Sequence, residues 1–132
     1  MLHAPTVWVV DDDADDQYFI ERAFKQLLPS ITIKQLTDGD EVIPCLQEAA
    51  VLPRLILLDL NMMRQNGHET LAELRRIPAY RRLPIVVFTT SQAEADKQKS
   101  LALGANGFLT KPPTLQGILQ LLSELISVWN LN

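Results

Sequence analysis

The sequence contains little cysteine and no long apolar run. Its one cysteine, Cys45, cannot form a disulfide within the chain, and we expect this thiol to behave as a small buried apolar group. No stretch approaches the roughly 18 consecutive apolar residues that identify a membrane-spanning helix. The first residues do not combine a basic segment with an apolar one. We therefore expect a cytoplasmic protein with no membrane partner.

The chain also lacks an excess of positive charge. Lys and Arg number 12 against 16 Asp and Glu, which gives a formal net charge of −4 at pH 7. Phosphate backbones select basic surfaces, so we expect no direct nucleic-acid partner. The basic pairs Arg75/Arg76 and Arg81/Arg82 are interpreted as parts of a solvated face. No Gly-x-Gly-x-x-Gly motif follows the first apolar run, which excludes dinucleotide binding of that kind.

The length and composition are those of one ordinary globular domain. The chain has 132 residues, of which 47% are hydrophobic and 21% charged. A domain of this size buries a core without metal or disulfide staples. We expect one domain over residues 1–132 and no separate effector domain, so the output of the protein depends on a protein partner.

Short apolar runs rich in β-branched residues recur along the chain. They do not alternate polar with apolar residues, which is typical of strands buried on both faces of a parallel sheet. The predicted strands are Thr6–Val10, Ile31–Leu36, Leu55–Leu58, Ile85–Phe88 and Gly107–Leu109.

Segments with apolar residues at helical spacing separate these runs. The first stripe consists of Phe19, Ile20, Ala23, Phe24 and Leu27. The clearest stripe, in the last helix, consists of Leu115, Ile118, Leu119, Leu122, Ile126 and Trp129. Alternating strands and helices predict an α/β fold with right-handed crossovers. We expect a five-stranded doubly wound parallel sheet, flavodoxin-like (βα)5, with strand order 2-1-3-4-5.

Several residues indicate where helices begin. Asp38 is predicted to be an N-cap, and Ser91–Glu94 is predicted to form a capping box. Three acidic residues are interpreted as capping and charging the start of the first helix: Asp13, Asp15 and Asp16. The segment Ala93–Ser100 is nearly free of large apolar residues. We therefore expect the fourth helix to be held loosely.

Polar residues follow four of the five predicted strands. Asp11, Asp12 and Asp13 follow the first strand, Asp59 the third, Thr89 the fourth, and Lys111 comes shortly after the fifth. The carboxyl ends of parallel strands meet at one edge of a sheet, where such folds bind ligands. We therefore expect these side chains to lie close together.

The chemistry of this group points to phosphoryl transfer. Several carboxylates in one crevice repel each other and need a cation, and oxygen-rich sites that share a phosphate suit Mg²⁺. An ionised aspartate can accept a phosphoryl group. A lysine supplies a positive charge to the phosphoryl oxygens, and a threonine hydroxyl can donate to another oxygen.

The order of these motifs resembles the receiver domain of bacterial two-component response regulators, over essentially the whole chain. The resemblance rests on Val9–Asp13, on Asp59–Met62 with Gly67, on Phe88–Ser91 and on Phe108–Pro112. Each motif alone is weak, but the four occur in order at the predicted strand ends.

The resemblance implies a role for each site residue. Asp59 is the expected phosphoacceptor. Asp12 would hold Mg²⁺ directly, Asp11 through water, and Asn61 through its backbone carbonyl. Thr89 and Phe108 would be the switch residues. Lys111 would contact the phosphoryl group, and its bond to Pro112 would be cis.

One position departs from the family pattern. Met63 stands where the family has proline after the methionine of the Asp-x-x-Met motif. The missing ring frees the backbone torsion φ. Because no expected catalytic atom is involved, we expect altered mobility of the loop after Asp59 rather than lost chemistry.

The resulting functional hypothesis is a single-domain response regulator. A sensor histidine kinase or a histidine phosphotransfer protein would phosphorylate Asp59. The chain would be a phosphoacceptor that assists its own phosphorylation and dephosphorylation rather than an enzyme acting on other substrates. Phosphorylation would switch the surface of the fourth helix, fifth strand and fifth helix for a downstream protein or for onward transfer. Surplus apolar residues in the last helix suggest a partner or homodimer contact: Leu121, Leu125 and Val128.

Two other functions use the same residues. A Mg²⁺-dependent phosphatase with an aspartate nucleophile usually needs a second aspartate two residues later, where this chain has Asn61. A receiver-like binding module that is never phosphorylated would have no need of the complete set of site residues.

Overall fold

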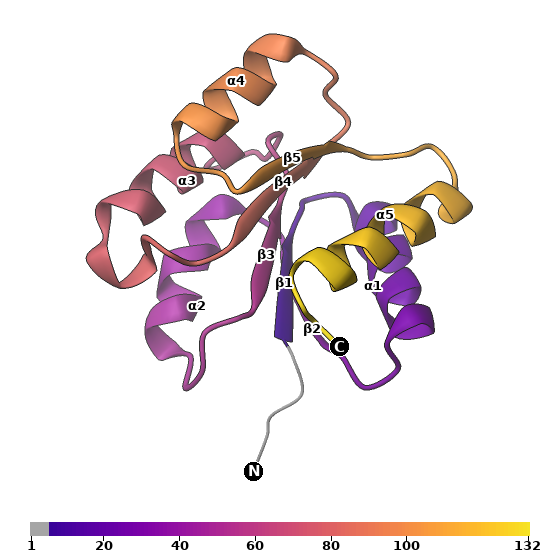
Figure 1. Ribbon diagram of the computed structural model, residues 1–132. Helices are drawn as coiled ribbons and strands as arrows, with labels where there is room; N and C mark the ends of the chain where they lie inside the picture. Colours follow the sequence, from indigo (N-terminus) through magenta and orange to yellow (C-terminus); the bar gives the residue numbers. More distant parts are fainter. Residues whose placement is uncertain (1–5) are drawn as a thin grey trace.

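One parallel sheet forms the centre of the molecule (Figure 1). The computed structural model describes residues 6–132. The predicted strand order is confirmed, since the five strands lie in the order β2-β1-β3-β4-β5. The strands are β1 (Thr6–Val10), β2 (Thr32–Leu36), β3 (Leu55–Leu58), β4 (Ile85–Thr89) and β5 (Gly107–Thr110). No predicted strand end is displaced by more than one residue.

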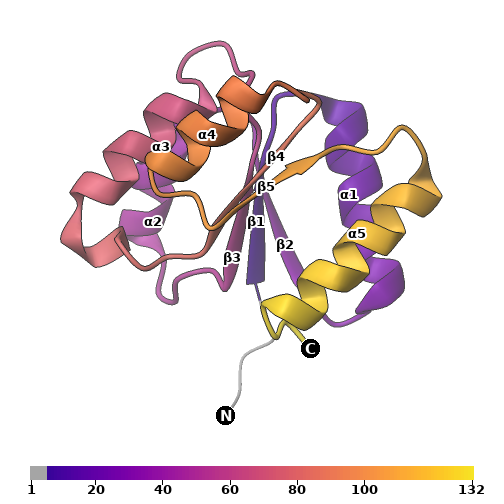
Figure 2. The ribbon, with the colours of Figure 1, turned by 45° about the horizontal axis from the view of Figure 1, so that its top comes forward.

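Helices cover both faces of the sheet (Figure 2). On one face lie α1 (Ala14–Leu27) and α5 (Leu115–Val128). On the other face lie α2 (Val42–Glu48), α3 (Gly67–Arg76) and α4 (Glu94–Ala102). Two short 3-10 turns, η1 (Gly39–Glu41) and η2 (Pro78–Tyr80), precede α2 and follow α3.

The core consists of two apolar clusters, one on each face of the sheet. Alternate residues of β1 point to opposite faces, as a strand requires. Val7 and Val9 belong to the cluster under α1 and α5, and Trp8 and Val10 belong to the cluster under α2 and α3. All residues of β3 are buried. The central strands therefore hold the carboxyl edge of the sheet on a rigid base.

The buried face of α1 differs from the predicted stripe at one position. Phe19 is 41% exposed, whereas Gln17 is only 4% exposed. Gln17 lies three residues before Ile20 and seven before Phe24, which is the spacing of one helical face. The prediction for Phe19 was wrong because residues two apart do not share a helix face, so the face that buries Gln17 leaves Phe19 at its edge.

The fourth helix buries one residue, Ser100, as its composition predicted. The predicted capping box at its start is wrong, because the helix begins at Glu94 and Ala93 occupies the N-cap position. The Ser91 hydroxyl instead donates to Asp96 Oδ2 at 2.6 Å. Few apolar contacts therefore hold α4 against the rest of the molecule.

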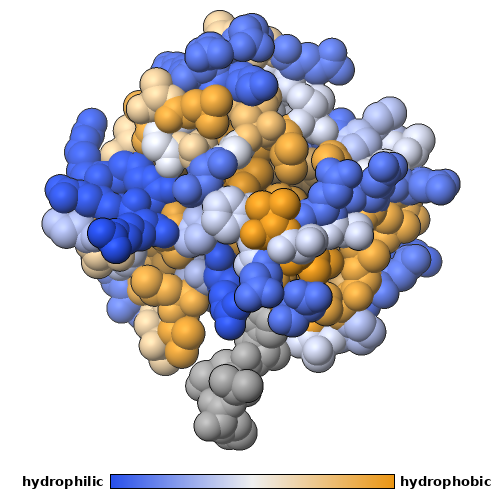
Figure 3. Space-filling view, in the orientation of Figure 1, coloured by the Kyte–Doolittle hydropathy of each residue, from blue (hydrophilic) through white to orange (hydrophobic). Residues whose placement is uncertain are grey.

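The last helix leaves apolar surface beside β5. Val128 is 72% exposed, whereas Leu125 is 6% exposed and thus belongs to the core, contrary to the prediction. Leu121, Val128 and Trp129 line a cavity over β5. Figure 3 shows apolar side chains gathered on this side of the molecule. Within residues 6–132, no helix combines the length and apolar character that a membrane crossing requires.

Candidate functional site

The structure brings together residues from four strand ends at the carboxyl edge of the sheet. Asp11 follows β1, Asp59 follows β3, Thr89 ends β4 and Lys111 follows β5. Backbone hydrogen bonds extend the ladder to this edge, from Asp59 N to Val10 O at 3.0 Å and from Lys111 N to Thr89 O at 2.6 Å. The sheet itself therefore positions these side chains.

Three carboxylates form an acidic cluster, which consists of Asp11, Asp12 and Asp59. One oxygen from each lies within 4.8 Å of the others. Asp11 is 2% and Asp59 6% exposed, whereas Asp12 is exposed. Oxygens bound to one Mg²⁺ lie up to about 4.2 Å apart, because each metal–oxygen bond is about 2.1 Å long. The three carboxylate oxygens would thus bind one small divalent cation after moving slightly closer together.

Lys111 is the cation next to this cluster. Its Nζ lies 2.6 Å from Asp11 Oδ2 and 3.6 Å from Asp59 Oδ2. Nζ also lies 2.7 Å from Oδ2 of Asp16, in the first turn of α1. Burial disfavours the charge of Lys111, but the hydrogen bonds to Asp11 and Asp16 outweigh it and raise the pKa of Lys111. The ammonium group is therefore charged at neutral pH.

The single charge of Lys111 does not balance the two buried carboxylates, Asp11 and Asp59. Burial raises the pKa of Asp11 to about 6, although the hydrogen bonds from Lys111 and from the Asp13 N–H lower it. Burial also raises the pKa of Asp59, against the charge of Lys111 and the hydroxyl of Thr89. An additional cation would stabilise both ionised carboxylates. Electrostatics and donor atoms thus agree on a divalent cation.

The two residues expected to act as switches lie on β4 and β5. Thr89 is fully buried, and its hydroxyl accepts from the Ser91 N–H at 3.3 Å. Phe108 is half-buried and pairs with Val87 in the sheet. The two residues thus lie on neighbouring strands, Thr89 at the carboxyl end of β4 and Phe108 within β5.

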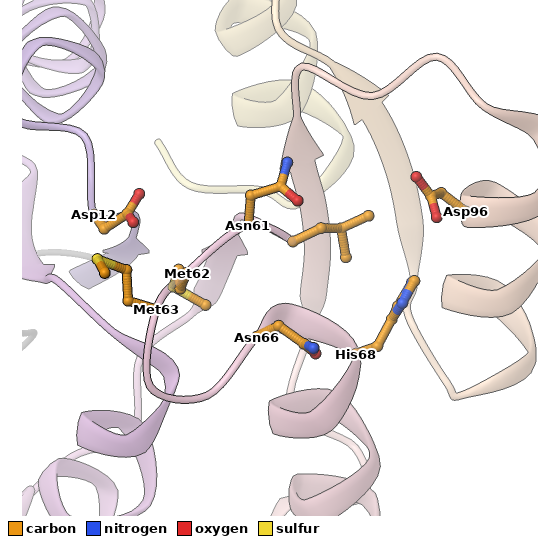
Figure 4. Close-up of a pocket in the computed structure, with 8 residues that line it drawn as sticks. Asp12, Asn61, Met62, Met63, Asn66, His68 and Asp96 are labelled. Atoms are coloured by element: carbon orange, nitrogen blue, oxygen red, sulfur yellow. The ribbon is translucent and has the colours of Figure 1, made fainter.

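A polar cleft of about 460 Å³ opens beside the acidic cluster (Figure 4). Asn61 lies between Asp12 on one side and His68 and Asp96 on the other. The remaining lining residues are Leu60, Met62, Met63 and Asn66. His68 Nε2 lies 2.9 Å from Ser100 Oγ, which links α3 to α4. The cleft is therefore bounded by the loop after Asp59 and by the loosely held fourth helix.

Asp16 has a role at the site that the sequence analysis missed. Asp13 caps α1 as predicted, because its Oδ1 accepts from the Asp16 N–H at 3.0 Å. The Asp16 carboxylate, however, turns to Lys111 and binds it. The two residues are 95 positions apart in the sequence, so local pattern gave no signal for this contact.

The loop after Asp59 is tied to the end of β2. Asp38 occupies the N-cap position of η1, as predicted, but its side chain makes no capping hydrogen bond there. Its carboxylate accepts from the backbone N–H groups of Arg64 at 2.9 Å and Gln65 at 2.8 Å. The Arg64 side chain binds Asp40 at 2.8 Å. Met63 is 91% exposed at the tip. The loop is thus anchored immediately after the residue that replaces proline.

The prediction of a cis bond between Lys111 and Pro112 is wrong. Within residues 6–132 every peptide bond is trans. The trans form is intrinsically favoured before proline, by about 0.5–1 kcal/mol.

Comparisons with known proteins agree with the fold. The family model described as the response regulator receiver domain matches residues 7–123. Response regulator Rcp1 of Synechocystis sp. is 33% identical over 128 residues, which cover 93% of this chain and 87% of that protein.

Two solved structures share the fold at similar identity. The phosphorylated cyanobacterial phytochrome response regulator RcpA superposes with a TM-score of 0.89 at 30% identity, covering 96% of this chain and 94% of that one. The Mn²⁺-bound form of Rcp1 superposes with a TM-score of 0.84 at 32% identity, covering 95% of this chain and 94% of that one.

Proposed function

This chain belongs to the family of response regulator receiver domains, and on that premise we propose that it is a single-domain response regulator that is phosphorylated on Asp59 with the help of Mg²⁺. The observation that carries the proposal is the position of the Asp59 carboxylate. It lies in the acidic cluster, within 3.6 Å of the Lys111 ammonium group and beside the Thr89 hydroxyl.

The donor in this proposal is a phosphohistidine of a sensor histidine kinase or of a histidine phosphotransfer protein. An oxygen of Asp59 attacks phosphorus, a new oxygen–phosphorus bond forms, and the nitrogen–phosphorus bond to the donor imidazole breaks. The departing imidazole takes up a proton from solvent. Charged groups of the site would hold the phosphoryl group in line between the attacking oxygen and the departing nitrogen, with no further covalent intermediate.

Several residues would assist the transfer. Asp11, Asp12, Asp59 and the Asn61 carbonyl would hold Mg²⁺, which offsets the charge on the phosphoryl oxygens. The Mn²⁺-bound form of the relative Rcp1 supports a divalent cation here. Lys111 would exchange its contact with Asp11 for one with the phosphoryl group, while its ion pair with Asp16 would keep the ammonium group near the site.

The added charge would change the surface of α4, β5 and α5. A phosphoryl group carries about −1.5 to −2 charges and strong hydrogen-bond acceptors. The Thr89 hydroxyl would move to donate to it, and Phe108 on the neighbouring strand would turn inward into the space that Thr89 leaves. Because α4 buries only Ser100, it can shift with little loss of packing. This is the expected two-state element of the switch.

The output is a protein partner in the cytoplasm, or onward transfer of the phosphoryl group. The net charge of −4 favours a protein over a nucleic acid. Apolar residues over β5 and α5, among them the exposed Val128, support a downstream protein or a second copy of the chain at this surface. Dephosphorylation by water at the same site would return the switch to its resting state.

Intact mass measured after incubation with Mg²⁺ and acetyl phosphate tests the chemistry. Wild type should gain one phosphoryl adduct, and Asp59→Asn should gain none. Omitting Mg²⁺ should abolish the adduct on wild type. A stoichiometric adduct on Asp59→Asn would refute the assignment of the acceptor. Steady turnover of a phosphomonoester would identify a phosphatase, and partner binding that is indifferent to Asp59→Asn would identify a binding module.

A further inference from the structure

A buried glutamine lies directly beneath the acidic cluster. Gln17 is 4% exposed and occupies the buried face of α1. Its Nε2 lies 2.8 Å from Val9 O, 3.1 Å from Asp11 O and 2.9 Å from Leu36 O. Two N–H bonds thus serve three carbonyl acceptors at the ends of β1 and β2.

The orientation of this amide is fixed. Rotating it by half a turn would place Oε1 against three carbonyl oxygens, which repel it. In the observed orientation Oε1 of Gln17 is buried and has no hydrogen-bond partner among the residues that the structure describes. A buried unpaired oxygen is unfavourable. An apolar residue would fill the same core position without that penalty, so the donor contacts of Gln17 call for another explanation.

Of the three contacts of Gln17, the one with the Asp11 carbonyl affects the acidic cluster directly. This carbonyl and the Asp12 N–H belong to one planar peptide unit. Holding the carbonyl therefore fixes the backbone torsions on both sides of that unit, and with them the directions in which the two side chains leave the backbone. Both side chains belong to the acidic cluster.

The other two contacts give this peptide a rigid support. Leu36 O accepts from the Asp11 N–H at 2.9 Å and also from Gln17 Nε2. Val9 O belongs to β1, two residues before Asp11. Gln17 therefore joins the first turn of α1 to the point where β1 and β2 separate. The Asp11 carboxylate has further partners in the Asp13 N–H and Lys111, whereas the exposed Asp12 carboxylate takes its direction from the backbone.

We propose that Gln17 is a positioning residue for the divalent cation: its amide holds the Asp11–Asp12 peptide so that both carboxylates face the same ion. The inference rests on the proposed function, because it assumes that the acidic cluster binds a divalent cation. Gln17 does not contact the ion, and its effect passes through the backbone between two ligands. Loss of such outer contacts typically weakens metal binding about 10–100-fold.

Binding of Mn²⁺ to the full chain, measured by electron paramagnetic resonance, tests this directly. Gln17→Met keeps the size and the helix propensity but removes the amide. It should weaken Mn²⁺ binding about tenfold or more. Ile20→Val is the matched control, because Ile20 lies one turn further on the same buried face and is 1% exposed. This control should bind Mn²⁺ as wild type does.

A second measurement separates positioning from general damage. The rate of phosphorylation by acetyl phosphate should need more Mg²⁺ in Gln17→Met, yet reach the wild-type rate at saturating Mg²⁺. Equal Mn²⁺ affinity in Gln17→Met and Ile20→Val would overturn the inference and leave the proposed function intact. Absence of Mn²⁺ binding in wild type would overturn both. If Gln17→Met does not fold, Gln17→Leu is measured against the same control with the same expected results.

Discussion

Replacing Asp38 by Asn should loosen the loop that carries Asn61. The Asp38 carboxylate is 2% exposed and accepts two backbone hydrogen bonds, from Arg64 and Gln65. Asn keeps one acceptor oxygen but turns an N–H group toward the second donor. One part-buried N–H then loses its charged acceptor, and a hydrogen bond to a charged group contributes about 1.5–3 kcal/mol. We expect Asp38→Asn to lower the free energy of unfolding by about 2 kcal/mol at pH 7.

The pH dependence of this difference has a definite sign. Burial raises the pKa of Asp38, but the hydrogen bonds from Arg64 and Gln65 outweigh burial and lower it below its ordinary value. A lowered pKa adds stability above the unfolded value of about 3.9, and this stability is lost as the pH falls through the folded pKa. The Asn variant has no such group. The gap between wild type and variant should therefore be constant from pH 7 to about pH 5 and narrow below about pH 4.

Urea unfolding followed by tryptophan fluorescence measures these free energies, since Trp8 is buried in the core. Asp40→Asn is the matched control. Asp40 belongs to the same loop contact, but its ion pair with Arg64 joins side chains that are 44% and 59% exposed. Such surface pairs contribute about 0–1 kcal/mol. A loss in Asp38→Asn no greater than in Asp40→Asn, or a gap that stays unchanged down to pH 3, would refute the reasoning.

Three further variants test other parts of the structure. Gly39→Ala should destabilise by about 1–3 kcal/mol in urea unfolding, because its Cβ would lie 2.0 Å from Thr70 Oγ1; wild-type stability would contradict the packing. Lys111→Met should lower the free energy of unfolding of the metal-free protein by about 3 kcal/mol. It should also tighten Mn²⁺ binding, since the acidic cluster loses the ammonium group that competes with the metal ion. Weaker Mn²⁺ binding in this variant would contradict the prediction. Arg75→Met removes three hydrogen bonds of 2.7–3.0 Å to loop oxygens. It should lower the free energy of unfolding by about 2 kcal/mol and speed amide hydrogen exchange near Tyr80. Unchanged exchange near Tyr80 would contradict this prediction.

The fold could be predicted because its strongest signals are local. Strands buried on both faces must be apolar throughout, so β3 and β4 stand out as continuous runs. The alternation with helices then leaves few arrangements of the sheet. Strand ends are visible for the same reason, and polar residues directly after a buried strand are conspicuous. That is why the sequence alone groups Asp11, Asp59 and Thr89.

The contacts that support the site could not be predicted, because they join segments that are far apart in the sequence. Asp16 looks like any acidic residue in the first turn of a helix, and only the return of β5 beside β4 brings Lys111 to it. Gln17 has helical spacing with Ile20 and Phe24, which is a usable signal for burial but not for its contact with the sheet. Asp38 meets its partners 26 and 27 residues later.

These contacts divide the site into a rigid side and a compliant side. On the rigid side, Gln17 holds the end of β1, and Asp38 anchors the loop after Asp59. On the compliant side, α4 buries one residue and is joined to its neighbours by polar contacts such as that of Ser100 with His68. A charge added at Asp59 would act on both sides, but only the compliant side can yield at low cost. The direction in which such a signal would travel thus follows from where the apolar contacts are few. Asp38 binds the loop directly after Met63, so we expect the same direction with methionine in place of proline.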